Sequence, residues 1–436
     1  MTDQPLVQYA SLTDVGMRRA ANQDSLAVRL CSEYTEWEQC GHLFVVADGM
    51  GGHSVGDLAS RISVESLPLA YFKMEAESIS ERLRSAIREA NRAINDKARE
   101  NPEFADMGTT CSTLALSPYG AHVGHVGDSR VYRVRNGEIQ QLSFDHSLQW
   151  EMIRQGRATM ENVDLLHPRN VITRCLGPDS EVTIDVEGPF HVQTGDCFVI
   201  CSDGLTGHVS DTEIGAVAST LPPADASRLL INLANCRGGA DNITVVIAKV
   251  DSYPRLTGTF KDSPRKVDSG TSVSSNKPHA LISTLSLSIF AFLATIGLAL
   301  LAWGNRWGLL FICPALILGF IRLIASTRRS VDPVDEADRS DTAQLSDAER
   351  PAARSPYRTA SARIERPFLD FLAEAQSELT QAAKDNGWEV SMDELAELNR
   401  QAVSAVENRK PAIAMQHRAS AIDGLMKALY SQTRRT

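Results

Sequence analysis

Four aspartates stand at the ends of apolar segments, where a carboxylate is available to bind a divalent cation. Each is next to or near a glycine or a small polar residue, which lets the backbone approach an ion. An aspartate of this kind, taken singly, is most often a turn residue. Four that meet at one edge of a sheet would form an all-oxygen cluster suited to Mg²⁺ or Mn²⁺. The four are Asp48 after Leu43–Ala47, Asp128 after Val123–Val126, Asp203 after Phe198–Cys201 and Asp241 before Ile243–Ile247.

Two other kinds of catalytic site fit the sequence less well than this metal cluster. Gly52–Gly56 matches the GxSxG pattern of serine hydrolases. That pattern needs a strand that runs straight into the first glycine, whereas five residues here separate Ala47 from His53. A cysteine-dependent phosphatase needs an arginine six positions after the nucleophilic cysteine, and none of the eight cysteines has one. We therefore favour the metal-dependent alternative.

The segments that carry these aspartates predict an antiparallel sheet covered by helices. Asn136-Gly137, flanked by the segments 131–135 and 138–142, is a strong signal for a two-residue hairpin. A second hairpin is expected at 111–126, around Pro118-Tyr119-Gly120. Between Ser54 and Glu100 the spacing is helical, with Leu83, Ile87, Ala90 and Ile94 on one face. Adjacent hairpins argue against a doubly wound parallel sheet.

Composition excludes several classes of protein. The 436 residues include 44 Lys and Arg against 54 Asp and Glu, so the formal net charge is −10. An acidic chain without a long basic block is a poor nucleic-acid binder, and no nucleic acid is expected as a partner. The cysteines show no CxxC pair, so neither a disulfide framework nor a cysteine zinc site is indicated. The N-terminus has no secretory signal.

Two apolar runs predict a transmembrane hairpin. Leu281–Trp303 has no charged residue and is long enough to cross a core of about 30 Å, and Trp307–Ala325 contains only Arg322. A buried helical hairpin in a soluble domain is the alternative. Basic residues flank the pair on both long sides, so the positive-inside rule places the N- and C-terminal regions in the cytoplasm. We expect a multi-pass protein of the cell (inner) membrane that contacts lipid through 281–325.

Changes in composition divide the chain into five regions. The last region has helical periodicity, with Phe368, Leu372, Ala375 and Leu379 on one stripe and a capping box at Ser391 and Glu394. We expect a small three-helix unit there. The regions are a mixed α and β domain at 1–250, a flexible linker at 251–280, the hairpin at 281–325, a polar linker at 326–362 and a helical tail at 363–436.

Residues 1–250 resemble the bacterial metal-dependent protein serine/threonine phosphatases of the 2C type. The matching segments occur in the order of the family, and none lies after about residue 250. They are Asp14-Val15-Gly16 with Arg19, Asn22-Gln23-Asp24, Ala47–His53, Met107–Thr110, Val126–Arg130, Asp145-His146-Ser147, His167–Arg174, Cys201–Leu205 and Asp241–Thr244.

The resemblance implies an α+β fold, a four-layer αββα sandwich with two central antiparallel sheets, here followed by the hairpin and the helical tail. It also implies two Mn²⁺ or Mg²⁺ ions, with a third in bacterial members. By similarity Asp48 bridges two ions and Gly49 offers its carbonyl. The other implied ligands are Asp203 and Asp241 on the first ion, Asp24 through water on the second, and Asp128 with Asp203 on the third.

The same resemblance gives roles to two catalytic residues. Arg19 matches the arginine that holds the phosphoryl group, for which its planar fork is suited. His53 matches the proposed general acid that protonates the leaving alkoxide. Gln23 departs from the family, because many relatives carry glutamate there, and the loss of that charge would weaken the second ion. The stretch 147–170 corresponds to a variable flap that bears on substrate choice.

The expected function is that of a membrane-anchored phosphatase that hydrolyses phosphoserine and phosphothreonine. A water or hydroxide bridging the two ions attacks phosphorus without a covalent enzyme intermediate. The expected partners are phosphorylated proteins, including a co-anchored Ser/Thr kinase. Two alternatives are a pseudophosphatase that binds phosphoproteins without turnover and a membrane scaffold whose working part is the tail. A pseudophosphatase predicts the loss of a metal aspartate, and none is lost.

Overall fold

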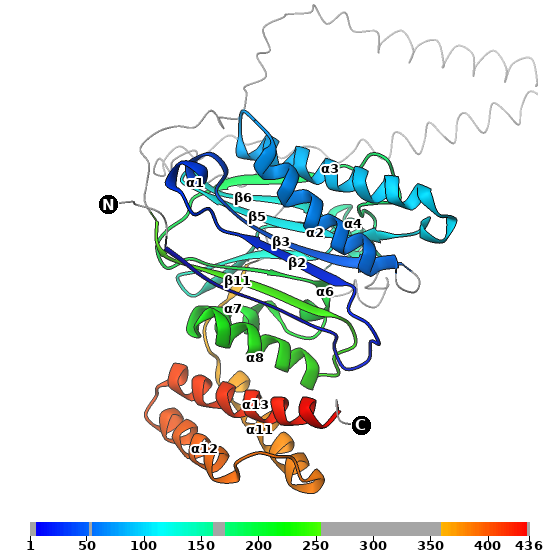
Figure 1. The fold of residues 1–436 in the computed structure, drawn as a ribbon. Helices are drawn as coiled ribbons and strands as arrows, with labels where there is room; N and C mark the ends of the chain where they lie inside the picture. The colour runs from blue at the N-terminus through cyan, green and yellow to red at the C-terminus, as the bar shows by residue number, and fades with distance from the viewer. Residues whose placement is uncertain (1–5, 52–54, 160–170, 254–358, 434–436) are drawn as a thin grey trace, which may run out of the picture. The chain divides into compact units, whose positions relative to one another are not determined.

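Two antiparallel sheets form the centre of the molecule (Figure 1). The computed structural model describes residues 6–51, 55–159, 171–253 and 359–433. The first sheet has the order β1 (Leu6–Asp14), β11 (Ile243–Ser252), β10 (Cys197–Cys201), β7 (Arg130–Arg135), β8 (Glu138–Gln141) and β12 (Thr359–Ser361). The second has β2 (Asp24–Arg29), β3 (His42–Met50), β5 (Cys111–Ser117), β6 (Gly120–Val126) and β9 (Asp185–Phe190), and β4 (Gly108–Thr109) pairs with β3. The predicted pair of antiparallel sheets is confirmed.

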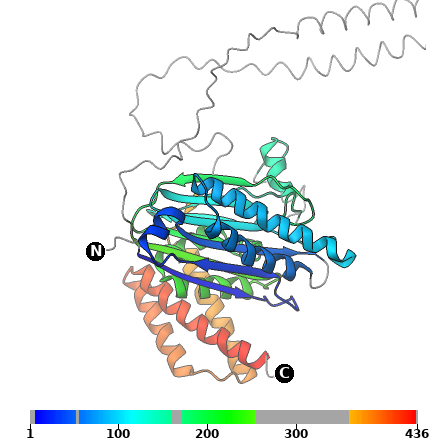
Figure 2. The same cartoon turned by 45° about the horizontal axis from the view of Figure 1, so that its top comes forward.

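Helices cover the outer face of each sheet, which gives four layers (Figure 2). Three helices lie with the second sheet: α1 (Tyr34–Cys40), α2 (Val55–Lys73) and α3 (Ile79–Glu100). Three lie with the first sheet: α6 (Asp203–Thr206), α7 (Asp211–Thr220) and α8 (Pro223–Cys236). Two short helices belong to connections: the 3₁₀ helix η1 (Pro102–Phe104) and α4 (Leu148–Arg154).

Strands with two buried faces explain the continuous apolar runs in the sequence. In β3, Phe44 and Val46 face the other sheet, whereas Val45 packs with α2 and α3. In β10, Phe198 and Ile200 face the other sheet and Val199 packs with α7 and α8. Side chains alternate between faces of a strand, and here both faces meet a core. The layer between the sheets is therefore as apolar as the two outer layers.

The turn and the helix that local sequence signals predicted are present in the structure. Asn136 and Gly137 have φ values of 53° and 81°, as a type I′ turn requires, and they join β7 to β8. Helix α3 begins after Ser78, whose side chain accepts a hydrogen bond from the Glu81 amide at 3.1 Å. Its predicted apolar face, which includes Leu83 and Ile87, is buried. Both predictions are confirmed.

The predicted membrane localisation is wrong. The described residues contain no helix that is long and apolar enough to cross a membrane. A helix needs about 20 consecutive, mostly apolar residues to cross the hydrocarbon core of a membrane. This finding corrects the expectation of a multi-pass membrane protein, and with it the expected lipid contact and co-anchored kinase. The hairpin at 281–325, on which those expectations depended, lies outside the described residues.

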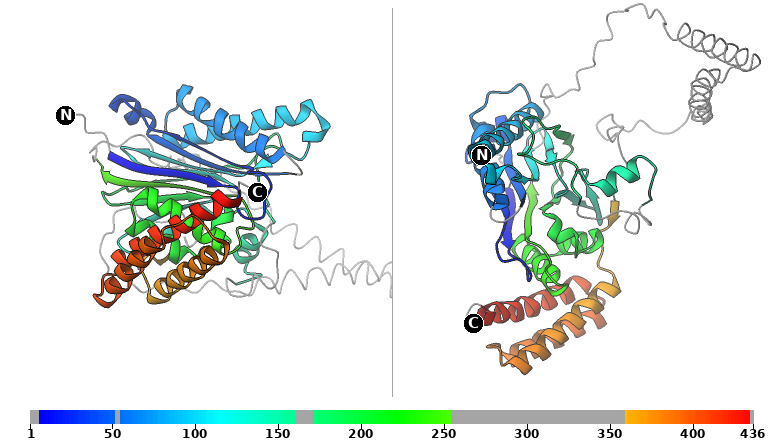
Figure 3. Two further views of the ribbon diagram at one scale, coloured as in Figure 1. Left: turned by 60° about the horizontal axis from the view of Figure 1, so that its bottom comes forward. Right: turned by 90° about the vertical axis from the view of Figure 1, so that its right-hand side faces the viewer.

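The C-terminal residues form three helices that pack on the first sheet's side of the molecule (Figure 3). They are α11 (Arg366–Asn386), α12 (Met392–Glu407) and α13 (Pro411–Thr433), and the three-helix prediction is confirmed. Strand β12, from the stretch predicted as a polar linker, pairs with β8 at the edge of the sheet. Leu372 and Ile422 belong to the same buried cluster as α7 and α8. The three helices thus share a core with the sheet domain.

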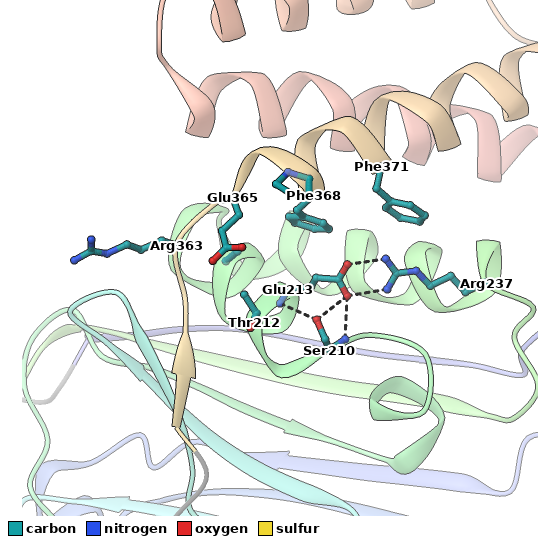
Figure 4. A pocket seen from close by; sticks show the side chains of 10 residues that line it. Ser210, Thr212, Glu213, Arg237, Arg363, Glu365, Phe368 and Phe371 are labelled. Atoms are coloured by element: carbon teal, nitrogen blue, oxygen red, sulfur yellow. Dashed lines mark hydrogen bonds and ion pairs between the residues drawn. The ribbon is translucent and has the colours of Figure 1, made fainter. Parts of the chain in front are cut away.

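Side chains of α7 and α11 line a cavity of about 420 Å³ between these two helices (Figure 4). Arg237 forms a bidentate ion pair with Glu213, with N–O distances of 2.8 and 2.6 Å. The Arg237 guanidinium also lies 4.2 Å from the centre of the Phe371 ring. Glu213 also completes the capping box of α7 with Ser210. One side chain of the sheet domain therefore contacts both α7 and the C-terminal helices.

Candidate functional site

Five of the predicted metal aspartates come from the same end of the two sheets. Asp24 and Asp48 are directly opposite one another in the β2–β3 ladder of the second sheet. Asp203 is the first residue of α6, just after β10, and Asp241 stands just before β11, so both come from the first sheet. Asp128 lies where the chain crosses from β6 to β7, between the sheets. The fold brings together residues that are up to 217 positions apart in sequence.

Hydrogen bonds tie the two sheets together at this end. Ser202 donates its hydroxyl proton to Asp24 Oδ2 at 2.7 Å and accepts from the Thr244 amide at 3.0 Å. Asn242 accepts from the Gln23 amide through Oδ1 at 2.8 Å, and its amide group donates to the carbonyls of Val15 and Ala21. Ser202 and Asn242 each lie beside a predicted metal aspartate. Sequence analysis gave them no role, although their polar side chains next to an aspartate were the available signal.

The strand end that carries Asp48 is held by two threonines. Thr110 accepts from the Asp48 amide through Oγ1 at 2.9 Å, and its own amide donates to the Asp48 carbonyl at 2.8 Å. The Thr109 hydroxyl donates to the same carbonyl at 2.9 Å. Because its backbone is fixed on both sides, Asp48 has little freedom to move away from the other carboxylates.

The glycines after Asp48 and Asp203 are required by packing. A Cβ on Gly49 would lie 2.1 Å from the Gly56 carbonyl oxygen at the start of α2. A Cβ on Gly204 would lie 2.0 Å from the Asn242 carbonyl oxygen. Real Cβ atoms do not approach backbone oxygens so closely, so each aspartate is followed by the one residue that lets the chain pass.

The carboxylates repel one another, and burial adds to this effect. Burial, with the nearby charges of Asp203 and Asp241, raises the pKa of Asp24 to about 7, against the opposing hydrogen bonds from Thr244 and Ser202. Burial and the neighbouring aspartates also raise the pKa values of Asp48, Asp128 and Asp203. The interaction of Asp48 with Asp203 favours the proton on Asp48. Without cations, this cluster retains protons that carboxyl groups normally lose.

Buried oxygens without hydrogen-bond partners indicate whether divalent cations fit this cluster. Asp24, Asp128 and Asp203 each have an Oδ1 atom that is buried and has no hydrogen-bond partner. Buried oxygens of this kind are costly unless something satisfies them, and hard divalent cations prefer carboxylate oxygen. In the described residues no three acidic, histidine or cysteine side chains already stand in metal-binding geometry. The donor set fits such ions by its chemistry and its burial.

Of the two predicted catalytic residues, Arg19 lies in the described part of the chain and His53 does not. Arg19 Nη2 donates to Asp241 Oδ2 at 2.8 Å, and both side chains are partly exposed. Arg19 thus lies at the aspartate cluster, where an arginine that binds a phosphoryl group is expected. His53 lies outside the described residues, as does the flap segment 160–170.

A buried ion pair that sequence analysis did not assign lies beside Asp128. Arg130 donates to both oxygens of Asp145, at 2.7 to 3.0 Å, and also to the Tyr132 hydroxyl at 3.1 Å. Asp145 raises the pKa of Asp128 whereas Arg130 lowers it, although burial is the largest influence. His146 accepts from the Gly127 amide through Nδ1 at 3.1 Å and donates from Nε2 to Asp185 Oδ2 at 3.1 Å.

Comparison with known proteins relates this region to phosphatases. The family model described as protein phosphatase 2C matches residues 17–234. Protein phosphatase PhpP of Streptococcus pneumoniae serotype 2 is 34% identical over 250 residues, which cover 56% of this chain and 98% of that protein. The structure of the S. agalactiae serine/threonine phosphatase is 35% identical, with a TM-score of 0.50, and the match covers 56% of this chain and all of that one. The catalytic domain of phosphatase PstP, solved in complex with two manganese ions, is 31% identical with a TM-score of 0.49 and coverage of 57% and 100%.

Proposed function

The chain belongs to the protein phosphatase 2C family, and from this we propose how its aspartate cluster removes phosphate from phosphoserine and phosphothreonine in proteins. It is a metal-dependent protein serine/threonine phosphatase that uses Mn²⁺ or Mg²⁺. When bound, two such ions lower the pKa of a shared water molecule and neutralise charge on the phosphoryl group. Phosphorylated proteins are its substrates.

We assign the metal ligands to the residues that the fold brings together. The unpartnered oxygens of Asp24, Asp128 and Asp203 support this assignment, because a cation would satisfy them. Asp48 is placed centrally, since its backbone is fixed and its pKa responds to Asp24, Asp128 and Asp203. The residues that would hold the ions are Asp48 for both, the Gly49 carbonyl, Asp203 and Asp241 for the first, Asp24 through water for the second, and Asp128 with Asp203 for a third.

Arg19 is proposed to hold the phosphoryl group of the substrate. A guanidinium can donate two parallel hydrogen bonds to phosphate oxygens, whereas lysine acts as a point charge. Its present bond to Asp241 supports the role, because it keeps the guanidinium at the carboxylate cluster until substrate arrives. His53 is proposed as the acid that protonates the departing serine or threonine oxygen. We also retain residues 1–250 as the catalytic region and 363–436 as the helical tail.

The single observation that carries the proposal is the convergence of buried, unpartnered carboxylate oxygens where the two sheets meet. The test is phosphate release from a phosphothreonine peptide by the full chain, with Mn²⁺ and with chelator. Asp241→Asn is expected to abolish release. Asp225→Asn, which changes a carboxylate paired with Arg228 on α8, is the matched control and should retain activity.

The alternative function is phosphoprotein binding without turnover. If the folded, metal-loaded chain bound several phosphopeptides and released no phosphate from any of them, this alternative would replace the proposal. Activity that persisted in chelator, or in Asp241→Asn, would contradict the metal-dependent mechanism instead.

A further inference from the structure

A second cavity, of about 340 Å³, lies within the helices α11, α12 and α13. It is far in sequence from the aspartate cluster and outside the matched residues 17–234. Its apolar lining comes from short or aliphatic side chains such as Leu395 and Met392. None of its lining residues is acidic. The polar and charged lining residues are Gln376, Ser377, Thr380, Gln381, Lys384, Asn399 and Arg418.

Arg418 is a buried cation without a carboxylate partner. Only 8% of the residue is exposed. One guanidinium nitrogen, Nη1, donates to Gln376 Oε1 and to Asn399 Oδ1, both at 2.5 Å. Among the described residues no carboxylate lies within ion-pair distance of it. The two amides come from α11 and α12 and fix the guanidinium, but neutral amides leave its charge uncompensated.

Arg418 lines the cavity, and two of its three guanidinium nitrogens are open to a ligand. Nε and Nη2 of Arg418 have no hydrogen-bond partner within the described ranges, and neither is sealed from solvent, because neither is among the buried unpartnered atoms. Burial lowers the pKa of this arginine, which reflects the cost of keeping its charge away from water. A buried charge of this kind is strongly unfavourable unless an opposite charge completes it. An anion in the cavity would supply that charge.

Further donors around the cavity suit an anion with several oxygens. Lys384, exposed on α11, forms no ion pair with any described residue and lines the same cavity. The Ser377 hydroxyl likewise has no partner in the part of the chain that the structure describes. The nearby Asp385 does not line the cavity and accepts a hydrogen bond from Gln381 at 2.8 Å. Two cations and a free hydroxyl therefore surround the cavity, with no carboxylate among its lining residues.

We propose that this cavity binds a phosphate group, held by the free edge of the Arg418 guanidinium and by Lys384. Arginine binds phosphate through parallel hydrogen bonds, and a tetrahedral dianion can use the lysine and the Ser377 hydroxyl at the same time. The volume exceeds that of a phosphate ion, so the group can also be carried on a serine or threonine side chain. The site is separate from the metal cluster and does not depend on phosphatase activity.

The test follows thermal unfolding of the full chain in increasing inorganic phosphate. Sodium chloride keeps the ionic strength constant, and Arg19→Ala with chelator removes phosphate binding at the metal site. Phosphate is expected to raise the unfolding temperature, because a ligand that binds only the folded state stabilises it. Arg418→Met should abolish the rise, and Lys384→Met should shift it to roughly tenfold higher phosphate, which corresponds to the loss of one charged contact.

Arg400→Met is the matched control, since Arg400 is exposed on α12 and pairs with Glu397. It should leave the response to phosphate unchanged. If Arg418→Met does not fold, Lys384→Met alone decides the question, because Lys384 is exposed. A rise that survives Lys384→Met at unchanged phosphate concentration, or that chloride or acetate produces equally, would overturn the proposal. Competition by a phosphothreonine peptide, compared with its unphosphorylated form, separates a protein-borne phosphate from the free ion.

Discussion

Replacing Asp24 by asparagine is expected to stabilise the metal-free protein while it impairs activity. The Asp24 carboxyl is buried, its Oδ1 atom has no partner, and its pKa rises from 3.8 to about 7 on folding. The pKa of this carboxyl is higher in the folded chain than in the unfolded chain. The carboxyl therefore stabilises the folded state at pH values below the pKa that it has in the unfolded chain. That contribution is lost as the pH rises from about 4 through about 7. The full shift corresponds to about 4 kcal/mol, which Asp24→Asn should recover at pH 8 and not at pH 4.

The assay is urea denaturation of the full chain in chelator at both pH values. Asparagine keeps an oxygen that can accept the hydrogen bond from Ser202, so the contact at 2.7 Å is retained. Asp96→Asn, at an exposed carboxylate of α3, is the control and should change stability by less than about 1 kcal/mol at either pH. With saturating Mn²⁺ the gain should shrink, because the wild-type carboxylate then has a cation. A loss of stability for Asp24→Asn at pH 8 in chelator would refute this reasoning and make Asp24 a structural acceptor.

Three further predictions concern packing and phosphate binding. Leu372→Ala, at a fully buried position of α11, should lower the free energy of unfolding by about 2–5 kcal/mol in urea denaturation; a smaller loss would mean that α11 contributes little to the shared core. Gly204→Ala should lower the unfolding temperature and weaken Mn²⁺ binding in calorimetry, because the added Cβ would lie 2.0 Å from the Asn242 carbonyl oxygen; an unchanged affinity would show that the backbone adjusts. Arg19→Lys should reduce kcat/KM on a phosphothreonine peptide roughly 10- to 100-fold, because lysine cannot make the bidentate contact to the phosphoryl group. Full activity of this variant would exclude Arg19 from phosphate binding.

The elements that carry the site could be predicted because their signals are local. The Asn136-Gly137 turn and the helix that carries Leu83 and Ile87 each depend on neighbouring residues, and both form as expected. The strand ends could also be found, since an aspartate after an apolar run is visible in the sequence. Which strand ends meet is a different matter. Asp24 and Asp48 lie opposite one another because of the register between β2 and β3. That register is set by pairing between segments that are distant in sequence.

Other features could not be predicted because they depend on side chains from distant elements. Ser202 joins the two sheets through Asp24 and Thr244, and although it stands next to Asp203, the sequence does not show which distant residues it contacts. Likewise, the helical spacing of 363–436 predicted helices but not their partner. The buried Arg418 was invisible in the sequence, because its contacts come from two other helices.

The C-terminal helices are linked through Asn235 of α8 to the loop that leads to Arg19, so the two parts of the chain cannot be treated as independent. Asn235, at the end of α8, donates to Asp14 Oδ1 at 3.0 Å and to the Tyr430 hydroxyl oxygen at 2.7 Å. Asp14 in turn accepts from the Gly16 amide at 2.9 Å, in the loop that leads to Arg19. A chain that ends near residue 250 loses this contact and also exposes the apolar face that α11 and α13 cover. Low activity of such a fragment would therefore reflect the missing support as well as any catalytic defect, and the mechanism has to be tested on the full chain.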